Sequence, residues 1–233
     1  MLQDRNDSLA GKRCMIIGSG KLARSLAKKL LEYGAIPLTF SDMSGHVYEP
    51  EGFDAAKLRT ISKIKNERGA KLGRYIIAST TAQFNDPPSV LDIPCDLCFP
   101  CGAMNDVNEL AAQKLADAGC MGIIEGGHSC VTAEARSVLK KRGLVYGPHT
   151  LTMSGSCVVQ SLGAGTSTAT TATAATTGGL SQTDQQLKSE IARIYKDVKT
   201  TATEFNARGD LFAGATILGF LKVANVMMTH GAV

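Results

Sequence analysis

The sequence lacks a hydrophobic run of the kind that crosses a bilayer, which takes about 20 residues. Its start, MLQDRNDSLAGKR, also lacks the apolar core and the small-residue cleavage site of a secretory signal. We therefore expect a cytoplasmic protein with no membrane partner. Neither sign of charge dominates: a net charge of +4 is well below that of nucleic-acid-binding domains. No nucleic-acid partner is expected, and a small anionic ligand is favoured.

The chain has no shortage of core-forming residues. Hydrophobic residues make up 44% of its 233 positions, which excludes global disorder and allows one large domain or two small ones. It contains seven cysteines, an odd number in a chain that is neither small nor marked for secretion. We interpret them as reduced thiols.

Three of these cysteines, Cys95, Cys98 and Cys101, form a C-x-x-C-x-x-C pattern that raises the question of a metal site. The segment has the composition of a strand, in which residues three apart lie about 10 Å apart and point to opposite faces. Buried thiols are therefore predicted, and no metal site.

The histidines offer no clear catalytic group. His128 and Cys130 lie close together, but no third residue that would orient them is evident, and a loop histidine facing solvent is the simpler interpretation. His46, His149 and His230 have no partner by spacing.

Short apolar runs alternate with helical patterns along the first two thirds of the chain. Buried strands are predicted at residues 13–17, 36–40, 75–79, 96–99, 121–124 and 144–146. Helices are predicted at 21–33, 54–66, 106–118 and 132–141, the last with Thr132 as its N-cap and Gly143 just past its end. This alternation predicts an α/β fold: a Rossmann-like, doubly wound, mostly parallel sheet.

The pattern ends at residues 163–179, GAGTSTATTATAATTGG, which predict a flexible surface loop. Two C-terminal helices are expected after it, at about 184–206 and 213–229. The second is apolar around much of its circumference and so needs partners on more than one side.

A glycine turn follows the first predicted strand. Gly18, Ser19, Gly20, Lys21 and Leu22, with Ala23, fit G-x-G-x-x-G/A, in which glycine allows a tight turn and close approach of a pyrophosphate to the helix start. The six residues alone are weak evidence, because a glycine turn need not bind a ligand. A strand before the turn, a helix after it and an acid about 20 residues on, at Ser41-Asp42, favour a dinucleotide site.

The residues alone do not decide which dinucleotide binds. Asp42 is placed like the acid that holds the ribose hydroxyls of NAD. Residues 57–74, however, carry seven basic side chains and one acid, and Lys65 and Arg68 have the i, i+3 spacing of residues that can share a helix face. These cations favour the 2′-phosphate of NADP, although a solvated basic face is equally consistent with the pattern.

Four blocks of the chain resemble the coenzyme domain of hexameric glutamate dehydrogenases. GSGKLA and SDMSG resemble GSGNVA and SDSSG, and FPCGAMND resembles LPCATQNE. IIEGGHSCVTAEA resembles AEGANMPTTxEA, and LFAGATILGFLKVANVMMTHGAV resembles the terminal helix of that family. The blocks occur in the family's order from about residue 8 to the end.

The resemblance implies a single NADP-binding coenzyme domain formed by residues 1–162 and 180–233, with NAD less favoured. It implies pyrophosphate contacts at Gly18, Ser19 and Gly20, a 2′-phosphate site at Asp42, Lys65 and Arg68, and a contact of Asn105 near the nicotinamide ribose. The family's N-terminal substrate domain, which supplies the catalytic lysine and aspartate, is expected to be absent, so no catalytic residue is assigned.

Several positions depart from the family's motifs. Lys21, His128 and Met153 stand where the family has asparagine, and Gln160 where it has a serine that reaches the substrate. A methionine cannot reproduce the hydrogen bonds of an amide. Three interpretations follow: the NADP-binding part of a glutamate dehydrogenase-like oxidoreductase, a non-catalytic paralogue that binds a dehydrogenase subunit, or a fragment of a longer enzyme. We expect the chain alone to be inactive, and to self-associate or bind such a subunit through its terminal helix.

Overall fold

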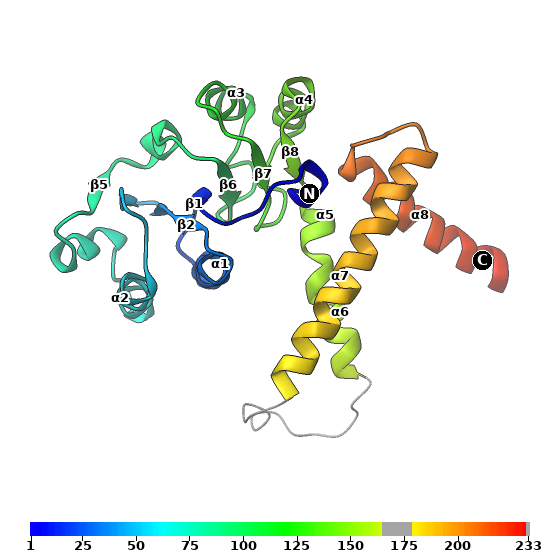
Figure 1. Ribbon diagram of the computed structural model, residues 1–233, viewed down its shortest axis with the longest axis horizontal. Helices are drawn as coiled ribbons and strands as arrows, with labels where there is room; N and C mark the ends of the chain where they lie inside the picture. Colours follow the sequence, from blue (N-terminus) through cyan, green and yellow to red (C-terminus); the bar gives the residue numbers. More distant parts are fainter. Residues whose placement is uncertain (165–178, 232–233) are drawn as a thin grey trace. The chain divides into compact units, whose positions relative to one another are not determined.

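The computed structural model describes residues 1–164 and 179–231, which form two compact units, Met1–His149 and Thr150–Val233 (Figure 1). Each unit is described by itself. The prediction that residues 1–162 and 180–233 make up one coenzyme domain stays a prediction.

The first unit is built on a five-stranded parallel sheet, in the order β2-β1-β6-β7-β8. Its strands are β1 (Arg13–Ile17), β2 (Ile36–Pro37), β6 (Leu97–Pro100), β7 (Gly122–Ile124) and β8 (Val145–Gly147). The helices between them are α1 (Lys21–Glu32), α2 (Ala55–Asn66), α3 (Glu109–Asp117) and α4 (Ala133–Arg142), with a short 3₁₀ helix at Gln3–Arg5. The predicted α/β fold with a mostly parallel sheet is confirmed.

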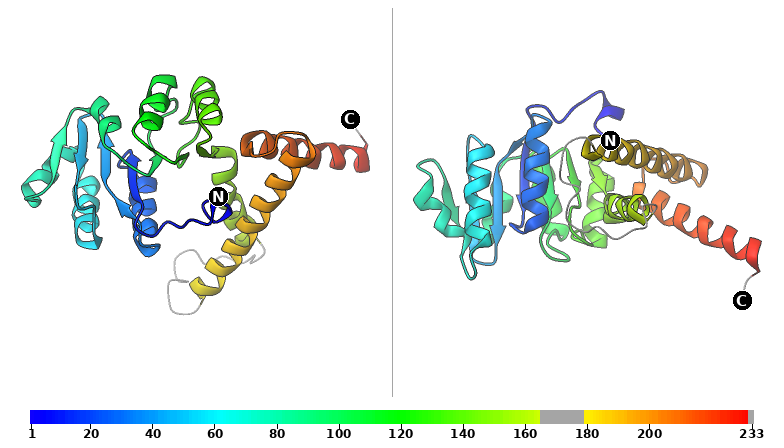
Figure 2. Two further views of the ribbon diagram at one scale, coloured as in Figure 1. Left: turned by 45° about the horizontal axis from the view of Figure 1, so that its top comes forward. Right: turned by 90° about the horizontal axis from the view of Figure 1, so that it is seen from below.

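Both faces of this sheet are covered, which explains why its strands are apolar throughout. Met15 and Ile17 of β1 pack in one cluster with α3 and α4, whereas Cys14 and Ile16 pack in the other with α1 and α2. Figure 1 shows α3 and α4 on the side of the sheet opposite α1, and Figure 2 shows α1 and α2 running alongside the strands. Alternate side chains of one strand therefore serve two cores, as in parallel sheets generally.

Capping fixes the ends of α4 as the sequence predicts. The side-chain hydroxyl of Thr132 accepts a hydrogen bond from the Ala135 N–H at 3.2 Å. Gly143 ends the helix with φ +68°, in the left-handed region that glycine adopts most easily.

The predicted strand at 36–40 divides between two sheets. Only Ile36 and Pro37 form β2, while β3 (Thr39–Asp42) joins β4 (Gly45–Tyr48) and β5 (Gln83–Asn85) in an antiparallel sheet. The hydroxyl of Thr39 accepts from the Ile16 N–H at 2.9 Å and donates to the Ile16 carbonyl at 3.0 Å. A side chain thus replaces the backbone ladder and lets this segment pair with β4 instead.

The predicted strand at 75–79 is wrong. Residues Leu72–Ala78 form a 3₁₀ helix, η2, and a second one, η3, follows at Pro87–Asp92. A strand would place Tyr75 and Ile77 on the same face, but Tyr75 is buried and Ile77 is 89% exposed. The Tyr75 hydroxyl donates to Glu49 at 2.8 Å, so a tertiary hydrogen bond helps to select the helical turn.

The second unit is helical. It contains most of α5 (His149–Thr152), then α6 (Ser154–Ala164), α7 (Gly179–Glu204) and α8 (Leu211–His230). The helix α7 therefore begins before the predicted residue 184. Residues 163–164 and 179 of the predicted loop are helical, and 165–178 lie outside the described residues. A Cβ on Gly214 would overlap the Val198 carbonyl oxygen, so this glycine lets α8 approach α7 closely.

The helix α8 overturns one expectation from the sequence. It has 20 residues and is apolar enough to cross a membrane by length and composition, although no such segment was expected. Only 11% of its most apolar window is buried. These criteria are weak evidence for a membrane span, because helices that pack against protein also meet them. The absence of a membrane partner stays a prediction.

Candidate functional site

The turn between β1 and α1 requires glycine at its first position. Gly18 has φ +109°, and a Cβ there would lie 2.9 Å from the carbonyl oxygen of Cys101. Gly20 is the N-cap of α1, and no side chain caps this helix start. The first N–H groups of α1 and its dipole therefore suit an anion. Ala23 is fully buried, as expected for the small third position of the motif.

The end of β3 lies directly beside this turn. The Ser41 hydroxyl accepts a hydrogen bond from the Gly18 N–H at 2.8 Å, and the Ser41 N–H donates to the Gly18 carbonyl at 3.2 Å. These two bonds hold the glycine turn against the strand that carries Asp42.

Asp42 connects the strand end to the basic helix α2. Its Oδ2 accepts from the Nζ of Lys65 at 2.9 Å, and its Oδ1 accepts from the backbone N–H and the hydroxyl of Ser44 at 2.9 and 2.6 Å. Burial alone would raise the pKa of Asp42, but the hydrogen bonds from Ser44 and Lys65 outweigh it and lower that pKa. The site therefore holds a carboxylate and an ammonium side by side.

A cleft of about 570 Å³ opens at this edge of the sheet. After β1 the chain forms β2 on one side of that strand, and it later forms β6 on the other side, so the strand order reverses at β1. The cleft lies at this switch point, where sheets of this kind bind their ligands. Its volume is within the usual range for small-molecule sites. The cleft is lined by Ile17, Gly18, Ser19, Gly20, Ser41, Asp42, Met43, Val90, Leu91, Cys101, Gly102, Ala103 and Asp106.

The structure brings together some of the predicted site residues and not others. Gly18, Ser19, Gly20, Ser41 and Asp42 all line the cleft, and Lys65 reaches it through the ion pair with Asp42.

Four other predicted contacts do not line the cleft. Lys21 and Leu22 are exposed on the first turn of α1, and Arg68 is exposed beyond the end of α2. Asn105 is exposed with φ +62°, and its N–H donates to the Ser129 carbonyl at 3.0 Å. Their contacts with a cofactor stay predictions.

Asp106 is a cleft residue that sequence reasoning missed. Its Oδ2 accepts from the Ala103 N–H at 2.6 Å, and burial raises the pKa of this carboxyl group. Its position after β6 is the sequence feature that could have indicated it, because the ends of parallel strands meet at one edge of the sheet, where ligands bind.

The three cysteines at 95, 98 and 101 are core or cleft thiols. Cys95 and Cys98 are buried, and burial raises the pKa of Cys98 well above its ordinary value. Cys101 is half-buried at the cleft, where burial raises its pKa to about 12. Among residues 1–164 and 179–231, no cluster of three or more His, Cys, Asp or Glu is placed to hold a metal ion.

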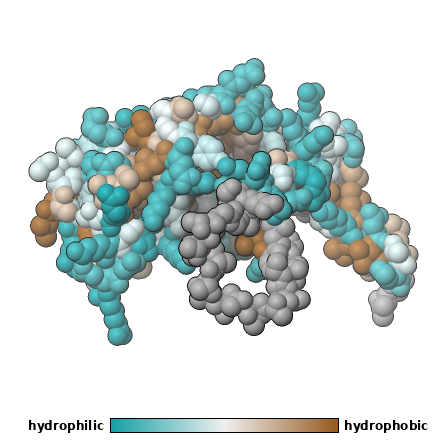
Figure 3. All heavy atoms as spheres, turned by 60° about the horizontal axis from the view of Figure 1, so that its bottom comes forward, coloured by the Kyte–Doolittle hydropathy of each residue, from teal (hydrophilic) through white to brown (hydrophobic). Residues whose placement is uncertain are grey.

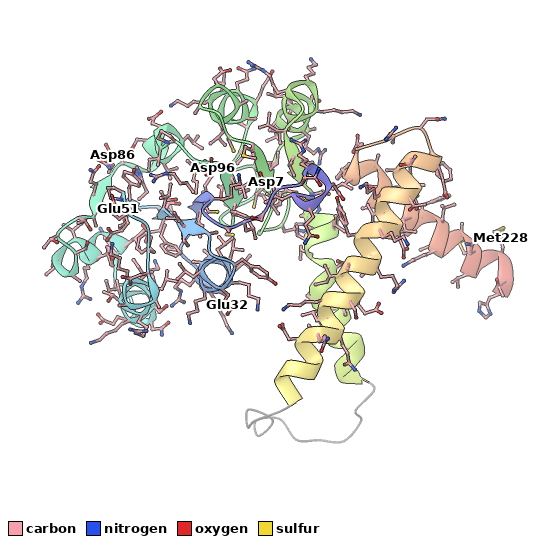
Figure 4. All side chains as sticks on the ribbon, in the orientation of Figure 1. Asp7, Glu32, Glu51, Asp86, Asp96 and Met228 are labelled. Atoms are coloured by element: carbon pink, nitrogen blue, oxygen red, sulfur yellow. The ribbon has the colours of Figure 1, made fainter. Side chains whose placement is uncertain are left out.

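Two histidines have partners that spacing did not reveal. His46 is buried, and its Nδ1 lies 2.9 Å from the carbonyl oxygen of Asp86, a residue labelled in Figure 4. Burial lowers the pKa of His46. His149 packs edge-to-face against His128 at a centroid distance of 4.6 Å.

His149 also contacts the fully buried Glu125. The Glu125 Oε2 lies 3.2 Å from the His149 Nδ1 and accepts from the His149 backbone N–H at 2.6 Å. It accepts from the Tyr146 hydroxyl at 2.9 Å, and Oε1 accepts from the Val131 N–H at 2.7 Å. The carboxylate ties the loop after β7 to the loop after β8. Glu125 and His149 are 24 positions apart in the sequence, which explains why no sequence motif indicated the pair.

Comparison with known proteins gives one consistent result. The model of the Glutamate/Leucine/Phenylalanine/Valine dehydrogenase family matches residues 1–231. An NADP-specific glutamate dehydrogenase of Chlorella sorokiniana is 34% identical over 100% of this chain and 44% of its own length. One from Helicobacter pylori is 32% identical over 99% of this chain and 51% of its own.

Solved structures agree with the sequence matches. Glutamate dehydrogenase 2 of Plasmodium falciparum superimposes with a TM-score of 0.88 at 33% identity, over 100% of this chain and 50% of that one. The chain thus spans about half the length of the relatives it matches.

Proposed function

The chain belongs to the Glutamate/Leucine/Phenylalanine/Valine dehydrogenase family, and we propose that its N-terminal unit binds NADP(H) as the coenzyme half of a glutamate dehydrogenase. The observation that carries this proposal is the cleft beside Gly18, with an uncapped helix start at one side and Asp42 and Lys65 at the other. The NADP-specific names of several relatives support the choice of cofactor.

The residues present fit such a cofactor. Gly20 leaves the backbone at the helix start open to a pyrophosphate, whose charge that helix start favours. Lys65 would hold the 2′-phosphate while keeping its contact with Asp42, and the exposed Arg68 would supply a second cation. When bound, the nicotinamide ring accepts or donates hydride. The part of this chain is to orient that ring and to hold the phosphates.

Calorimetry with NADPH and NADH tests the proposal. We expect the intact chain to bind NADPH more tightly, and the double change Lys65→Ala and Arg68→Ala to remove most of that preference. Each charge-assisted contact is worth about 1.5–3 kcal/mol. The matched control is Lys63→Ala with Lys71→Ala, two exposed lysines of the same basic segment, which should leave the preference intact. Equal affinity of the unmodified chain for both cofactors would contradict the proposal.

The reaction proposed for the whole protein is the oxidative deamination of glutamate to 2-oxoglutarate and ammonia. A second candidate is a non-catalytic paralogue, which the departures from the family's motifs favour, namely Lys21, His128, Met153 and Gln160. The activity of this chain is tested by following NADPH consumption at saturating 2-oxoglutarate and ammonium. We expect no turnover from this chain alone. Turnover that is lost when a residue of this chain is changed would contradict that expectation.

The exposed side chains of α8 support an association surface. Phe220, Val223 and Met228 are 70%, 60% and 75% exposed, and Figure 3 shows hydrophobic residues along this helix. Exposed apolar patches of this kind mark interaction sites. We propose that this surface mediates self-association or binding to a dehydrogenase subunit.

The compartment that we propose is the cytoplasm. The test is fractionation of cells that express the tagged chain, followed by a carbonate wash of the membrane fraction. Recovery of the chain in the washed membrane fraction would contradict this location and would assign α8 to a bilayer.

A further inference from the structure

A second cluster of reactive groups lies in the first unit, in the loops after β7 and β8. The Nε2 of His149 is 3.4 Å from the hydroxyl oxygen of Ser129, and its Nδ1 is 3.2 Å from Glu125 Oε2. Serine, histidine and carboxylate thus follow one another in the order that activates a serine nucleophile. None of these three residues lines the coenzyme cleft.

We propose that Ser129 is a nucleophile that accepts small acyl groups from carboxylic esters, with His149 as its general base and Glu125 as the positioning residue. This inference is independent of the proposed cofactor, because it rests on different side chains.

The hydrogen bonds of Glu125 define the state of the histidine. The carboxylate is fully buried and accepts four hydrogen bonds, from Val131, from Tyr146 and from two atoms of His149. A carboxylate only accepts, so the His149 Nδ1 carries a proton and donates it to this bond. In the neutral ring the lone pair is then on Nε2, facing the Ser129 hydroxyl. His128 packs against the ring and limits its rotation.

The backbone presents the serine in an unusual conformation. Ser129 has φ +50°, which side-chain-bearing residues rarely adopt, and such positions cluster at functional sites. Its carbonyl accepts from the Asn105 N–H at 3.0 Å, which secures the turn. Ser129 is half-buried, and the His149 side chain is 14% exposed. Access is therefore limited, which favours a small acyl donor.

One of the three residues, Ser129, departs from the family motif described above. The block EGGHSC has serine where EGANMP has methionine, and His149 stands outside the four resembling blocks. The cluster is therefore a property of this chain and not one inferred from the resemblance.

The chemistry balances without any further reagent. The Ser129 oxygen attacks the ester carbonyl carbon and passes its proton to the His149 Nε2. The C–O bond to the leaving alcohol breaks, and that alcohol takes the proton from His149. Water then attacks the acyl-serine with His149 as base, which releases the carboxylic acid and restores the serine hydroxyl.

The test is labelling of the intact chain with a small alkyl fluorophosphonate, read by peptide mass spectrometry. The serine oxygen displaces fluoride and leaves a stable adduct. We expect an adduct on Ser129 that is absent from Ser129→Ala and at least about ten-fold slower in His149→Gln, as general-base assistance predicts. The matched control is Ser137→Ala, an exposed serine on α4, which should not change the labelling.

The role of Glu125 needs a readout beyond loss of folding. Glu125→Gln should slow labelling, and Glu125→Asp should restore part of the rate, with unchanged circular dichroism in both. If Glu125→Gln does not fold, the Ser129 and His149 variants still decide the matter. Absence of an adduct on Ser129 in the folded chain, or labelling of Ser129 that His149→Gln does not slow, would overturn the proposal. Either result would leave the calorimetric test of cofactor binding unaffected.

Discussion

The helices α3 and α8 are both rich in apolar residues, but they differ in how many of these residues they bury. In α3, Ala112 and Leu115 are fully buried against the sheet, and Leu110 is left 74% exposed. In α8, only Leu211 and Gly214 are buried, while Phe220, Val223 and Met228 are mostly exposed. The composition of an apolar helix alone thus does not tell whether its side chains are buried in a core or exposed at the surface. The spacing of the apolar residues around the helix, relative to the surface on which the helix packs, decides whether they fill a core or form an exposed interface.

The largest effect on stability is expected from the buried side of α3. Changing Leu115 to Ala should lower the unfolding free energy of the first unit by about 2–5 kcal/mol, because it leaves a cavity in the core. The measurement is chemical denaturation followed by circular dichroism. Leu110→Ala, the same change in the same helix, is the control and should stay within about 0.5 kcal/mol. Equal costs at the two positions would break the comparison.

A smaller effect is expected at the buried carboxylate of Glu49. Lys57, Tyr75, Ser79 and Thr81 donate hydrogen bonds to it. Burial would raise the pKa of Glu49, but these bonds outweigh it and lower that pKa below 4.5. Glu49→Gln should cost about 1–3 kcal/mol near neutral pH, because a hydrogen-bonded charge is lost.

The same lowered pKa predicts how stability depends on pH. The folded chain binds the Glu49 proton less readily than the unfolded chain, so this contribution is complete above 4.5 and is lost as the pH falls through the folded pKa. Denaturation at a series of pH values should show a steeper acid decline in the unmodified chain than in Glu49→Gln. Identical declines would count against this assignment.

The N-cap of α4 should contribute less to the unfolding free energy than Glu49 does. Thr132→Ala removes the acceptor for the Ala135 N–H and should cost about 1 kcal/mol. Thr132→Ser keeps the hydroxyl and serves as the control. A cost for Ser as large as that for Ala would show that the methyl group matters, not the cap.

The smallest effect on stability is expected from substitutions of exposed residues on α8. These substitutions should instead change the association of the chain. Phe220→Ser with Val223→Ser should change the unfolding free energy by about 0.5 kcal/mol or less, because both side chains are mostly exposed. Light scattering should show less self-association than in the unmodified chain. Lys222→Ala, an exposed change on the same helix, is the control. A strictly monomeric unmodified chain at tens of micromolar would refute self-association through this surface.

Local sequence signals predicted much of the fold because they act over short distances. The alternation of apolar runs and helical patterns located α1 to α4 and the five strands of the parallel sheet, although residues 36–40 also contribute to β3. Thr132 and Gly143 bounded α4 as their capping chemistry requires. The glycine turn and Asp42 marked the cleft edge because the motif spans one strand–helix–strand unit.

The features that the sequence did not reveal depend on contacts between distant segments. Apolar composition at 75–79 is compatible with strand or helix, and the bond from Tyr75 to Glu49 could not be read from spacing. The strands β4 and β5 are short, and their pairing joins residues far apart in the chain. The contact of His149 with Glu125 likewise arises only when β7 and β8 lie side by side.

The bond from the Gly18 N–H to the Ser41 hydroxyl has a consequence for solvent exchange. That amide is already committed to a protein acceptor and is not available to an anion. It should therefore exchange slowly with deuterium whether or not a ligand is present. The N–H groups of Lys21 and Leu22 lie in the first turn of α1, where no side chain caps the helix. Their exchange should slow on ligand binding, so the Gly18 amide provides an internal reference within the same turn.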